Sequence, residues 1–485
     1  MNYGVERSWA TEPLFGGQPH RGIKMPKPYQ FAGAEYALAR DHCLVADQMG
    51  LGKSCEAMLI DNSIEAGRTL IICPASLRLN WIREIRLWTT RKNPTICVLL
   101  TGKDDINLDV DFLIVSYSLL LNDHIHGALL SVNWDHIVMD EAHALKDPTG
   151  NQRTKAICGH AFRGDWTPGV IEDVGRMTLM TGTPMPNQPL EVYNAIAILD
   201  WSAIDYMSIG QFREEYYTFG GGFVTIGRGK LRKMKWSHNV RNVPTNLDDL
   251  QQRLRSSIMV RRLKADVLAD LPQEEWIPFP LIATGKIRKA LKHEGWKQAE
   301  RMYEMDAHAF DAGIPVDGAI STARRELGEA KAPLVIEYVE QLLSEGAEKI
   351  VVAAWHRGVL ALLYDKLKAH NPVYLDGGTT PRKKQEAVDA FQQSDDIRLI
   401  IGQTLTIGEG HNLTAAQDVV LAEPDWVPGK NDQVLARIAR IGQEGAYCRG
   451  HIPVVPDTLD ERILGTSIRK DKNIHAALDL RDSLV

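Results

Sequence analysis

The sequence of 485 residues has few cysteines, no excess of positive charge and no long apolar run. Its six cysteines form no CxxC pair and no Cys/His cluster at zinc spacing, so we expect buried thiols in a reducing compartment. The net charge of −6 excludes a surface covered in positive charge, so any nucleic-acid contact must come from a local patch. The absence of a membrane-length run and of an apolar signal-peptide core favours a cytosolic or nuclear protein.

Residues 44–56, LVADQMGLGKSCE, predict a phosphate-binding loop. An apolar strand enters a turn with two glycines, and a helical pattern follows at once. Backbone N–H groups at a helix N-terminus bind phosphate oxygens, Lys53 can reach the β- and γ-phosphates, and the Ser54 hydroxyl can hold Mg²⁺. Asp47 occupies the first glycine position of the usual pattern, so an ordinary glycine turn with a solvated lysine is the alternative.

A series of short apolar runs follows the loop, alternating with helical segments. The runs are residues 70–73, 96–100, 112–115, 136–139 and 177–180. This rhythm predicts a parallel α/β sheet, in which ligands bind at the carboxyl ends of the strands. The polar residues that follow the runs, Ser76, Ser116, the pair Asp140-Glu141 and Thr183, are therefore candidates for a site.

The Asp140-Glu141 pair is the most diagnostic of these features. One carboxylate can bind Mg²⁺ while its neighbour polarises an attacking water, which is what hydrolysis of a γ-phosphate requires. Acidic pairs at strand ends also serve as helix caps, which is the structural alternative.

Between Gln188 and Pro333 the strand rhythm is lost. Helical periodicity is expected over residues 190–199, 247–268 and 286–302, and spaced glycines near residue 220 predict a β-hairpin. The hairpin carries a basic patch without acidic residues, with the alternative of a solvated face. The patch consists of Arg228, Lys230, Arg232, Lys233, Lys235 and Arg241.

A second α/β rhythm begins near residue 350, with apolar runs at residues 350–354, 373–375, 399–401, 419–422 and 451–455. A helix beyond the fourth run is expected to carry Gln433, Arg437 and Arg440. The two arginines are three residues apart and would share a helix face, as arginine fingers for a transition state would. Read alone, such a face is more often solvated or salt-bridged.

Taken together, the order of these elements resembles helicase superfamily two, and within it the SWI/SNF-type DNA translocases. The matching segments are PYQ (28–30), ADQMGLGKS (46–54), ICPASLRLNW (72–81), IVSYSLL (114–120), DEAHALKD (140–147), LMTGTPMPN (179–187), MVRRLKADVLADLP (259–272), DGGTTPRKKQEAV (376–388), GEGHNLTAA (408–416) and QVLARIARIGQ (433–443). Residues 329–356 and 422–433 and the glycine-rich hairpin look most like the annealing-helicase, HARP-type branch.

This resemblance implies a set of site residues. For ATP they are Gln30, which would contact adenine, with Met49, Gly50, Leu51, Gly52, Lys53, Ser54, Gly410 and Gln433; for catalysis Lys53, Asp140, Glu141, Arg437 and Arg440; for the metal Ser54 and Asp140. For DNA they are Ser76, Ser116, Thr183, Trp355 and Thr404 with Arg228, Lys230, Arg232, Lys233 and Lys235 of the patch. Gln48 in place of Glu, Ser54 in place of Thr and Ile407 in place of Gly depart from the family pattern.

The fold implied is α/β, with two RecA-like parallel-sheet lobes and helical insertions between them. We divide the chain into an irregular arm (1–27), an ATP-binding lobe (28–200), an insertion and linker region (201–335) and a second lobe (336–485). No accessory repeat or zinc finger is visible, so the chain is expected to be close to a bare motor.

The function implied is ATP- and Mg²⁺-dependent translocation on duplex or branched DNA, remodelling forks or annealing strands in repair, recombination or replication. The protein would then be nucleoid-associated in a prokaryote or virus and nuclear in a eukaryote. Remodelling of protein–DNA complexes, an RNA-directed DEAH-type helicase and a non-hydrolysing scaffold are the alternatives; the last predicts damage to Lys53, Asp140, Glu141 or Arg440, which is not seen.

Overall fold

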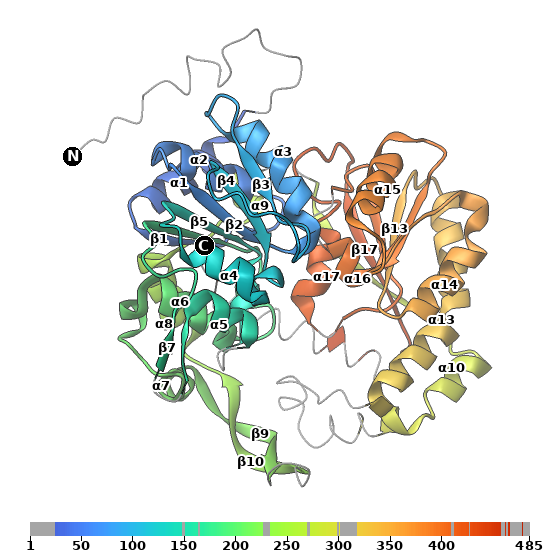
Figure 1. The fold of residues 1–485 in the computed structure, drawn as a ribbon. Helices are drawn as coiled ribbons and strands as arrows, with labels where there is room; N and C mark the ends of the chain where they lie inside the picture. The colour runs from blue at the N-terminus through green and yellow to red at the C-terminus, as the bar shows by residue number, and fades with distance from the viewer. Residues whose placement is uncertain are drawn as a thin grey trace. The chain divides into compact units, whose positions relative to one another are not determined.

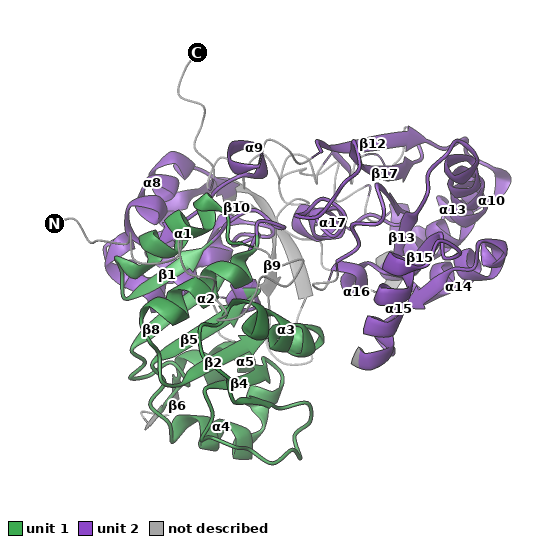
Figure 2. Ribbon diagram, turned by 90° about the horizontal axis from the view of Figure 1, so that it is seen from above, with its two compact units in different colours: residues 1–45, 52–141, 151–180 green, residues 46–51, 142–150, 181–485 purple. Residues whose placement is uncertain are grey.

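The computed structural model describes residues 25–147, 151–162, 165–226, 233–268, 272–297, 318–408, 412–425 and 427–456, with positions 300, 461, 464–465 and 478 (Figure 1). These residues form two compact units (Figure 2). Unit 1 comprises residues 1–45, 52–141 and 151–180, and unit 2 comprises residues 46–51, 142–150 and 181–485. Each unit contains a parallel sheet with helices, which confirms the predicted fold class.

Six strands of the first sheet lie in unit 1, in the order β1-β8-β5-β2-β4-β3, and neighbours among these six are parallel. They are β1 (His42–Val45), β2 (Thr69–Cys73), β3 (Ile96–Val98), β4 (Phe112–Ser116), β5 (His136–Asp140) and β8 (Arg176–Met180). The other elements are α1 (Pro28–Leu38), α2 (Lys53–Ser63), η1 (Ala75–Leu77), α3 (Arg78–Trp88), η2 (Leu119–Leu121), α4 (Asp123–Leu130), α5 (Gln152–Cys158), β6 (His160–Phe162) and β7 (Asp165–Thr167).

The central strands of this sheet are apolar runs rather than alternating patterns. Every residue of β2 and β4 is buried, as expected for a parallel sheet covered on both faces. The predicted strands are therefore confirmed, and their carboxyl ends carry Ser76, Ser116 and Asp140 just beyond or at the last residue.

The first part of unit 2 is mainly helical and also contains one hairpin and one short strand. It comprises η3 (Ala142–Leu145), η4 (Pro189–Val192), α6 (Tyr193–Asp200), η5 (Trp201–Ile204), α7 (Ile209–Tyr216), β9 (Tyr217–Ile226), β10 (Lys233–Pro244), α8 (Leu247–Ser257), β11 (Met259–Val260) and α9 (Lys264–Val267). The predicted hairpin is confirmed as the antiparallel pair β9 and β10. Arg228, Lys230 and Arg232 lie outside the described residues, whereas Lys233, Lys235 and Arg241 lie in β10.

The single helix predicted over residues 247–268 is wrong, because α8 ends at Ser257. The chain then pairs its backbone with the phosphate loop: Ala46 N donates to the Val260 carbonyl (2.8 Å) and Gln48 N to the Arg262 carbonyl (3.0 Å). Carbonyls committed to this pairing cannot accept helical hydrogen bonds, so the helical periodicity of the sequence is overridden.

The helix predicted over residues 286–302 is also interrupted, since α10 (Gly285–Ala290) is followed by turns. Lys292 N and His293 N bond back by three residues, and Gly295 N donates to His293 Nδ1 (3.0 Å). Residues 298–299 and 301–317 lie outside the described part of the chain.

The sheet of unit 2 has the order β12-β17-β16-β13-β15-β14. Its strands are β12 (Glu274–Pro280), β13 (Ile350–Ala354), β14 (Val373–Leu375), β15 (Leu399–Gln403), β16 (Asp418–Leu421) and β17 (Cys448–Val454). The helices are α13 (Gly318–Ser344), α14 (Arg357–Lys366), η7 (Lys368–His370), α15 (Pro381–Gln393), α16 (Thr404–Gly408) and α17 (Pro428–Leu435). The five predicted strands are confirmed. Strand β12 was not predicted from the sequence; it is an edge strand whose two prolines are tolerated because it pairs only with β17.

Alternate residues of β13 pack into different cores. Val351 and Ala353 belong to one apolar cluster, and Ile350, Val352 and Ala354 belong to another. Since successive strand side chains point to opposite faces, both faces of this sheet are covered. A third cluster joins α10 to α13, which runs continuously through residue 335.

Among the described residues, no helix is long and apolar enough to cross a membrane. All six cysteines are free thiols, and Cys43, Cys55, Cys73 and Cys448 are buried. Burial raises the pKa of the Cys448 thiol to about 12, so it stays protonated and unreactive.

Candidate active site

The phosphate loop ends where α2 begins, at Lys53. Gly50 has φ +91° and Gly52 has φ +81°, in the left-handed region that glycine adopts without strain. Gly52 is the N-cap of α2, whose first N–H groups have no acceptors within the helix. Lys53 and Ser54 lie half-buried in this first turn, so the loop has the geometry of an anion site.

Gln30 lies in α1 and contacts the phosphate loop. Its Nε2 donates to the Gly52 carbonyl (3.4 Å), and its Oε1 accepts from Lys27 N (2.8 Å). The side chain is almost fully buried. These contacts support the loop, while the role of Gln30 toward adenine stays a prediction.

Asp140 and Glu141 end β5 in the same unit. Burial raises the pKa of Asp140 to about 6, and the adjacent Glu141 carboxylate acts in the same direction. A hydrogen bond from Trp81 and the positive charge of Lys53 oppose this rise. Glu141 adopts φ +51°, a backbone conformation that costs energy for a residue with a side chain and that clusters at functional sites. Unit 1 thus brings Lys53 and the acidic pair together.

Two aromatic residues that the sequence analysis did not assign hold Asp140 in place. Trp81 Nε1 donates to Asp140 Oδ2 (3.0 Å), and the Tyr117 hydroxyl donates to the Asp140 carbonyl (2.8 Å). Glu141 N donates to Asp140 Oδ1 (2.9 Å). Both aromatic residues lie in segments that carry the family resemblance, which is the signal that marks them in the sequence.

The donor set fits Mg²⁺ that arrives with nucleotide rather than a metal held by the protein alone. Among the described residues, no group of three or more His, Cys, Asp or Glu side chains could hold a metal ion. Mg²⁺ typically uses one or two protein oxygens together with phosphate oxygens and water. Ser54 at the loop and Asp140 at the strand end offer that number of oxygens.

The three remaining nucleotide candidates on the described chain, Gln433, Arg437 and Arg440, lie in unit 2. The expectation that one helix face carries both arginines is wrong, because α17 ends at Leu435. The chain turns so that Leu435, Ile438 and Ala439 all enter the core. Arg437 is buried and its Nε donates to the Gln433 carbonyl (3.0 Å). Gly410 lies outside the described residues.

Arg440 lies against the part of the phosphate loop that belongs to unit 2. A Cβ placed on Gly50 would lie 2.9 Å from Arg440 Cβ and 3.0 Å from the Ala439 carbonyl oxygen. The absence of a side chain at Gly50 is therefore what lets these segments meet. Arg440 therefore contacts Gly50 within unit 2, and its role as an arginine finger stays a prediction.

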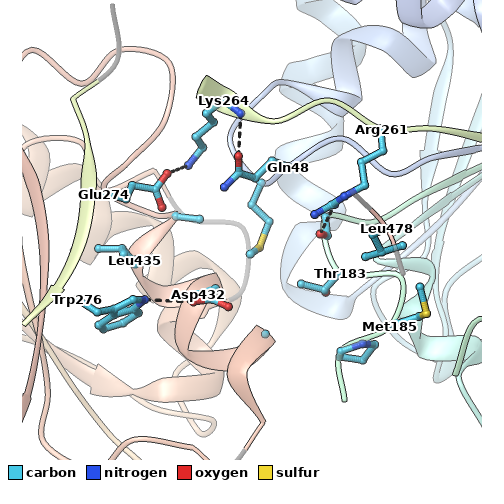
Figure 3. A pocket seen from close by; sticks show the side chains of 15 residues that line it. Gln48, Thr183, Met185, Arg261, Lys264, Glu274, Trp276, Asp432, Leu435 and Leu478 are labelled. Atoms are coloured by element: carbon cyan, nitrogen blue, oxygen red, sulfur yellow. Dashed lines mark hydrogen bonds and ion pairs between the residues drawn. The ribbon is translucent and has the colours of Figure 1, made fainter. Parts of the chain in front are cut away.

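A linker segment clamps the start of the loop. Arg262 makes a two-pronged ion pair with buried Asp47, with Nη2–Oδ2 of 2.6 Å and Nε–Oδ1 of 3.0 Å. Arg261 donates to the carbonyls of Ala46 (2.9 Å) and Gly182 (3.3 Å). Asp47, which breaks the usual glycine pattern, thus has a structural role. Figure 3 shows Arg261 and Gln48 around a cavity of unit 2 that Thr183 also lines.

The hydroxyls assigned to DNA differ in their partners. Ser76 Oγ, Thr183 Oγ1 and Thr404 Oγ1 are buried and have no hydrogen-bond partner in the described structure. Ser116 Oγ lies 3.2 Å from Ser118 Oγ. Unpaired buried hydroxyls call for an explanation, and a missing ligand is one. Thr404 is 1% exposed, so contact with DNA would require α16 to move.

Trp355, the remaining DNA candidate, follows β13. Its backbone N–H donates to Glu423 Oε2 (3.0 Å), and the Lys430 ammonium lies 4.8 Å from the ring centre. This arrangement fixes a half-buried aromatic ring beside a positive charge.

The sequence matches the SNF2-related domain over residues 29–279 and the helicase conserved C-terminal domain over residues 334–442. The first match covers more than half of the chain, so the chain belongs to the SNF2-related family, a class of DNA-dependent ATPases of the helicase-like superfamily. This match does not support the DEAH-type assignment predicted from the sequence, because the SNF2-related family is DEAD-like.

Among its relatives is the "DNA annealing helicase and endonuclease ZRANB3" of Bos taurus, with 30% identity over 453 residues, 91% of this chain and 40% of that protein. The "SWI/SNF-related matrix-associated actin-dependent regulator of chromatin subfamily A-like protein 1" of Xenopus laevis is 29% identical over 445 residues, 90% of this chain and 42% of that protein. These relatives confirm the resemblance to the annealing-helicase branch. The chain spans about two fifths of their length.

Among solved structures, the SWI2/SNF2 ATPase core of Sulfolobus solfataricus in complex with dsDNA is similar to this chain. It has 19% identity and a TM-score of 0.42, and the match covers 97% of this chain and 100% of that one.

Proposed function

We propose that this protein is an ATP-dependent DNA translocase. The observation that carries the proposal is the grouping of Lys53, Asp140 and Glu141 at the loop and strand end of unit 1. A non-hydrolysing scaffold has no need to keep a buried acidic pair, since burial and then the like charge of Glu141 raise the pKa of Asp140, and the ionised carboxylate so costs stability.

In this mechanism the residues divide the work of phosphoryl transfer. Lys53 and the first turn of α2 bind the phosphates, and Glu141 orients and deprotonates the attacking water. Arg440, with Arg437, stabilises the charge that develops in the transition state. Mg²⁺ held by Ser54 and Asp140 would neutralise charge on the β- and γ-phosphates. Trp81 keeps Asp140 oriented and favours its ionised form.

We propose duplex DNA as the track, contacted mainly through its phosphates. The unpaired hydroxyls of Ser76, Thr183 and Thr404 are donors that phosphate oxygens can accept from. Contacts of this kind carry little sequence information, so the motor would be largely indifferent to sequence. Work on DNA would place the protein at a nucleoid or in a nucleus, according to its source.

Branched DNA is the proposed preferred substrate, with fork remodelling or strand annealing as the outcome. The support is that the relative ZRANB3 of Bos taurus is named a DNA annealing helicase. A second candidate is remodelling of protein–DNA complexes, favoured by the relative named as a regulator of chromatin. Both functions would use the same ATP-driven translocation, and they differ in whether the translocating protein encounters a DNA branch or a protein bound to DNA.

The test is an ATPase assay on the purified chain with linear duplex, single-stranded DNA, forked DNA and RNA. We expect strong stimulation by the duplex and forked substrates and none by RNA. Equal stimulation by RNA, or hydrolysis that ignores all nucleic acids, would reject the proposed function.

A further inference from the structure

Lys264, in α9, contacts three segments of the chain whose relative positions matter for the proposed mechanism. Its backbone N–H donates to Gln48 Oε1 (2.7 Å), and its ammonium pairs with Glu274 Oε1 (2.6 Å), as Figure 3 shows. The same ammonium donates to the carbonyl of Ala439, the residue immediately before Arg440. One residue thus touches the phosphate loop, the first residue of β12 and the segment that presents Arg440.

Burial makes these contacts strong. The Lys264 side chain is 8% exposed, whereas that of Glu274 is 25% exposed. Burial lowers the pKa of Lys264, and the Glu274 carboxylate opposes this effect. An ammonium removed from water must find acceptors within the protein, and the Ala439 carbonyl is one of the two that it finds.

The contact with Ala439 is placed to act on Arg440. Beside burial, the positive charge of Arg440 also lowers the pKa of Lys264. A Cβ on Gly50 would lie 3.1 Å from Lys264 Cε and 2.9 Å from Arg440 Cβ. The side chains of Lys264 and Arg440 therefore both pack against Gly50. A change in the position of the lysine side chain is expected to change the packing of Arg440.

We propose that Lys264 is a positioning residue for the ATPase reaction. It holds the Ala439 carbonyl, and through it sets where Arg440 lies relative to Gly50, while Glu274 compensates the buried charge. Lys264 itself touches no substrate. The inference rests on the proposed ATPase function and adds a residue to it.

The alternative is that Lys264 only stabilises the fold. Its ion pair with Glu274 would then be one buried contact among others, like Lys349, whose ammonium donates to the carbonyls of Phe391 and Ser394. The positioning role and the purely structural role predict different effects of a Lys264 substitution on kcat when Arg440 is already absent.

The experiment is a double-mutant cycle on DNA-stimulated ATP hydrolysis. Lys264→Met removes the ammonium but keeps the backbone N–H that bonds Gln48, so we expect kcat to fall about tenfold or more with KM for ATP changed by less than about twofold. In an Arg440→Ala background, adding Lys264→Met should lower kcat by a further factor of less than about two, because the arginine through which Lys264 acts is absent. Lys264→Arg, which keeps donors for both acceptors, should retain at least about a third of kcat.

Lys349→Met is the matched control, because it also removes a buried lysine that donates to backbone carbonyls. It should lower the melting temperature and leave kcat within about twofold of the parent. Should Lys264→Met fail to fold, Lys264→Met/Glu274→Leu replaces it, since the double variant leaves no carboxylate without its cation.

Equal losses from Lys264→Met in the two backgrounds, or a lower melting temperature with unchanged kcat, would overturn the inference. A parent chain without DNA-stimulated hydrolysis would instead reject the proposed function, so the two failures are distinguishable.

Discussion

At the scale of single residues, the account depends on groups whose surroundings differ from those of surface side chains. The Asp140 carboxyl is buried beside Glu141 and has a pKa of about 6, and Glu141 has a left-handed backbone. Gly50 and Gly52 supply turn conformations that other residues adopt only with strain. Departures of this kind from relaxed surface geometry are expected where chemistry occurs.

Glu141→Gln should lower DNA-stimulated turnover by on the order of a hundredfold or more, because the amide cannot accept the proton of the attacking water. ATP should still bind the variant. Losses of similar size are expected for Lys53→Ala and Arg440→Ala, which remove positive charge from the transition state. Steady-state hydrolysis checks all three, with the exposed Glu386→Gln as control; a substantial residual rate in Glu141→Gln contradicts its role.

Trp81→Phe tests the indole hydrogen bond to Asp140. A hydrogen bond to a charged group contributes about 1.5–3 kcal/mol, and its loss disfavours the ionised carboxylate. We expect the Mg²⁺ concentration for half-maximal ATPase activity to rise about threefold or more. Trp296→Phe is the control, since Trp296 is equally buried and its Nε1 donates to the Ala323 carbonyl (3.2 Å). An unchanged Mg²⁺ requirement in Trp81→Phe would remove Trp81 from the site.

At the scale of elements, the sequence predicted what local patterns determine. The strands of both sheets, the hairpin and the loop-to-helix transition at Lys53 follow from apolar runs, spaced glycines and motif order. The places where it failed are those where long-range pairing overrides periodicity. Helix α8 stops because residues 260 and 262 bond the phosphate loop. Helix α17 ends before Arg437, whose carbonyl accepts a hydrogen bond from Leu413 N (3.0 Å) instead of a helical one. Edge strand β12 is hidden by its prolines, and the contacts of Lys264 involve residues far apart in the chain.

The hairpin is the element whose role is most open to experiment. If its basic patch contacts phosphates, each contact removed should reduce the salt slope of duplex binding by about 0.9. Arg232→Ala/Lys233→Ala/Lys235→Ala should therefore reduce the slope by up to about 2.7. The control with equal charge change is Lys366→Ala/Lys368→Ala/Arg382→Ala, three exposed positions in α14, η7 and α15. Identical slopes for the patch variant and the parent would restore the reading of a solvated face.

At the scale of the whole molecule, the two parallel sheets and the SNF2-related match define a helicase-like ATPase. Under the proposed function, the substrate question is what translocation would do to branched DNA. A translocase that grips a duplex through its phosphates can move toward a fork and let base pairing close behind it. Base stacking contributes roughly 1.4 kcal/mol per step, which favours the closed duplex. No wedge between the strands is then required.

We therefore expect ATP-dependent regression of a model fork, and closure of a bubble, with little unwinding of a tailed duplex. Both reactions are measured by gel electrophoresis of labelled strands, with Glu141→Gln as the inactive control. Efficient unwinding without regression would contradict the annealing assignment and leave the ATPase assignment intact.

The most direct test of the central claim, that ATP hydrolysis drives movement along duplex DNA, is displacement of a third strand from a triplex formed on linear duplex. This assay reports translocation without requiring strand separation. We expect the parent chain to displace the third strand only with ATP and Mg²⁺, and Glu141→Gln not to displace it. Rapid ATP hydrolysis on the same duplex with no displacement, or equal displacement by Glu141→Gln, would contradict the account.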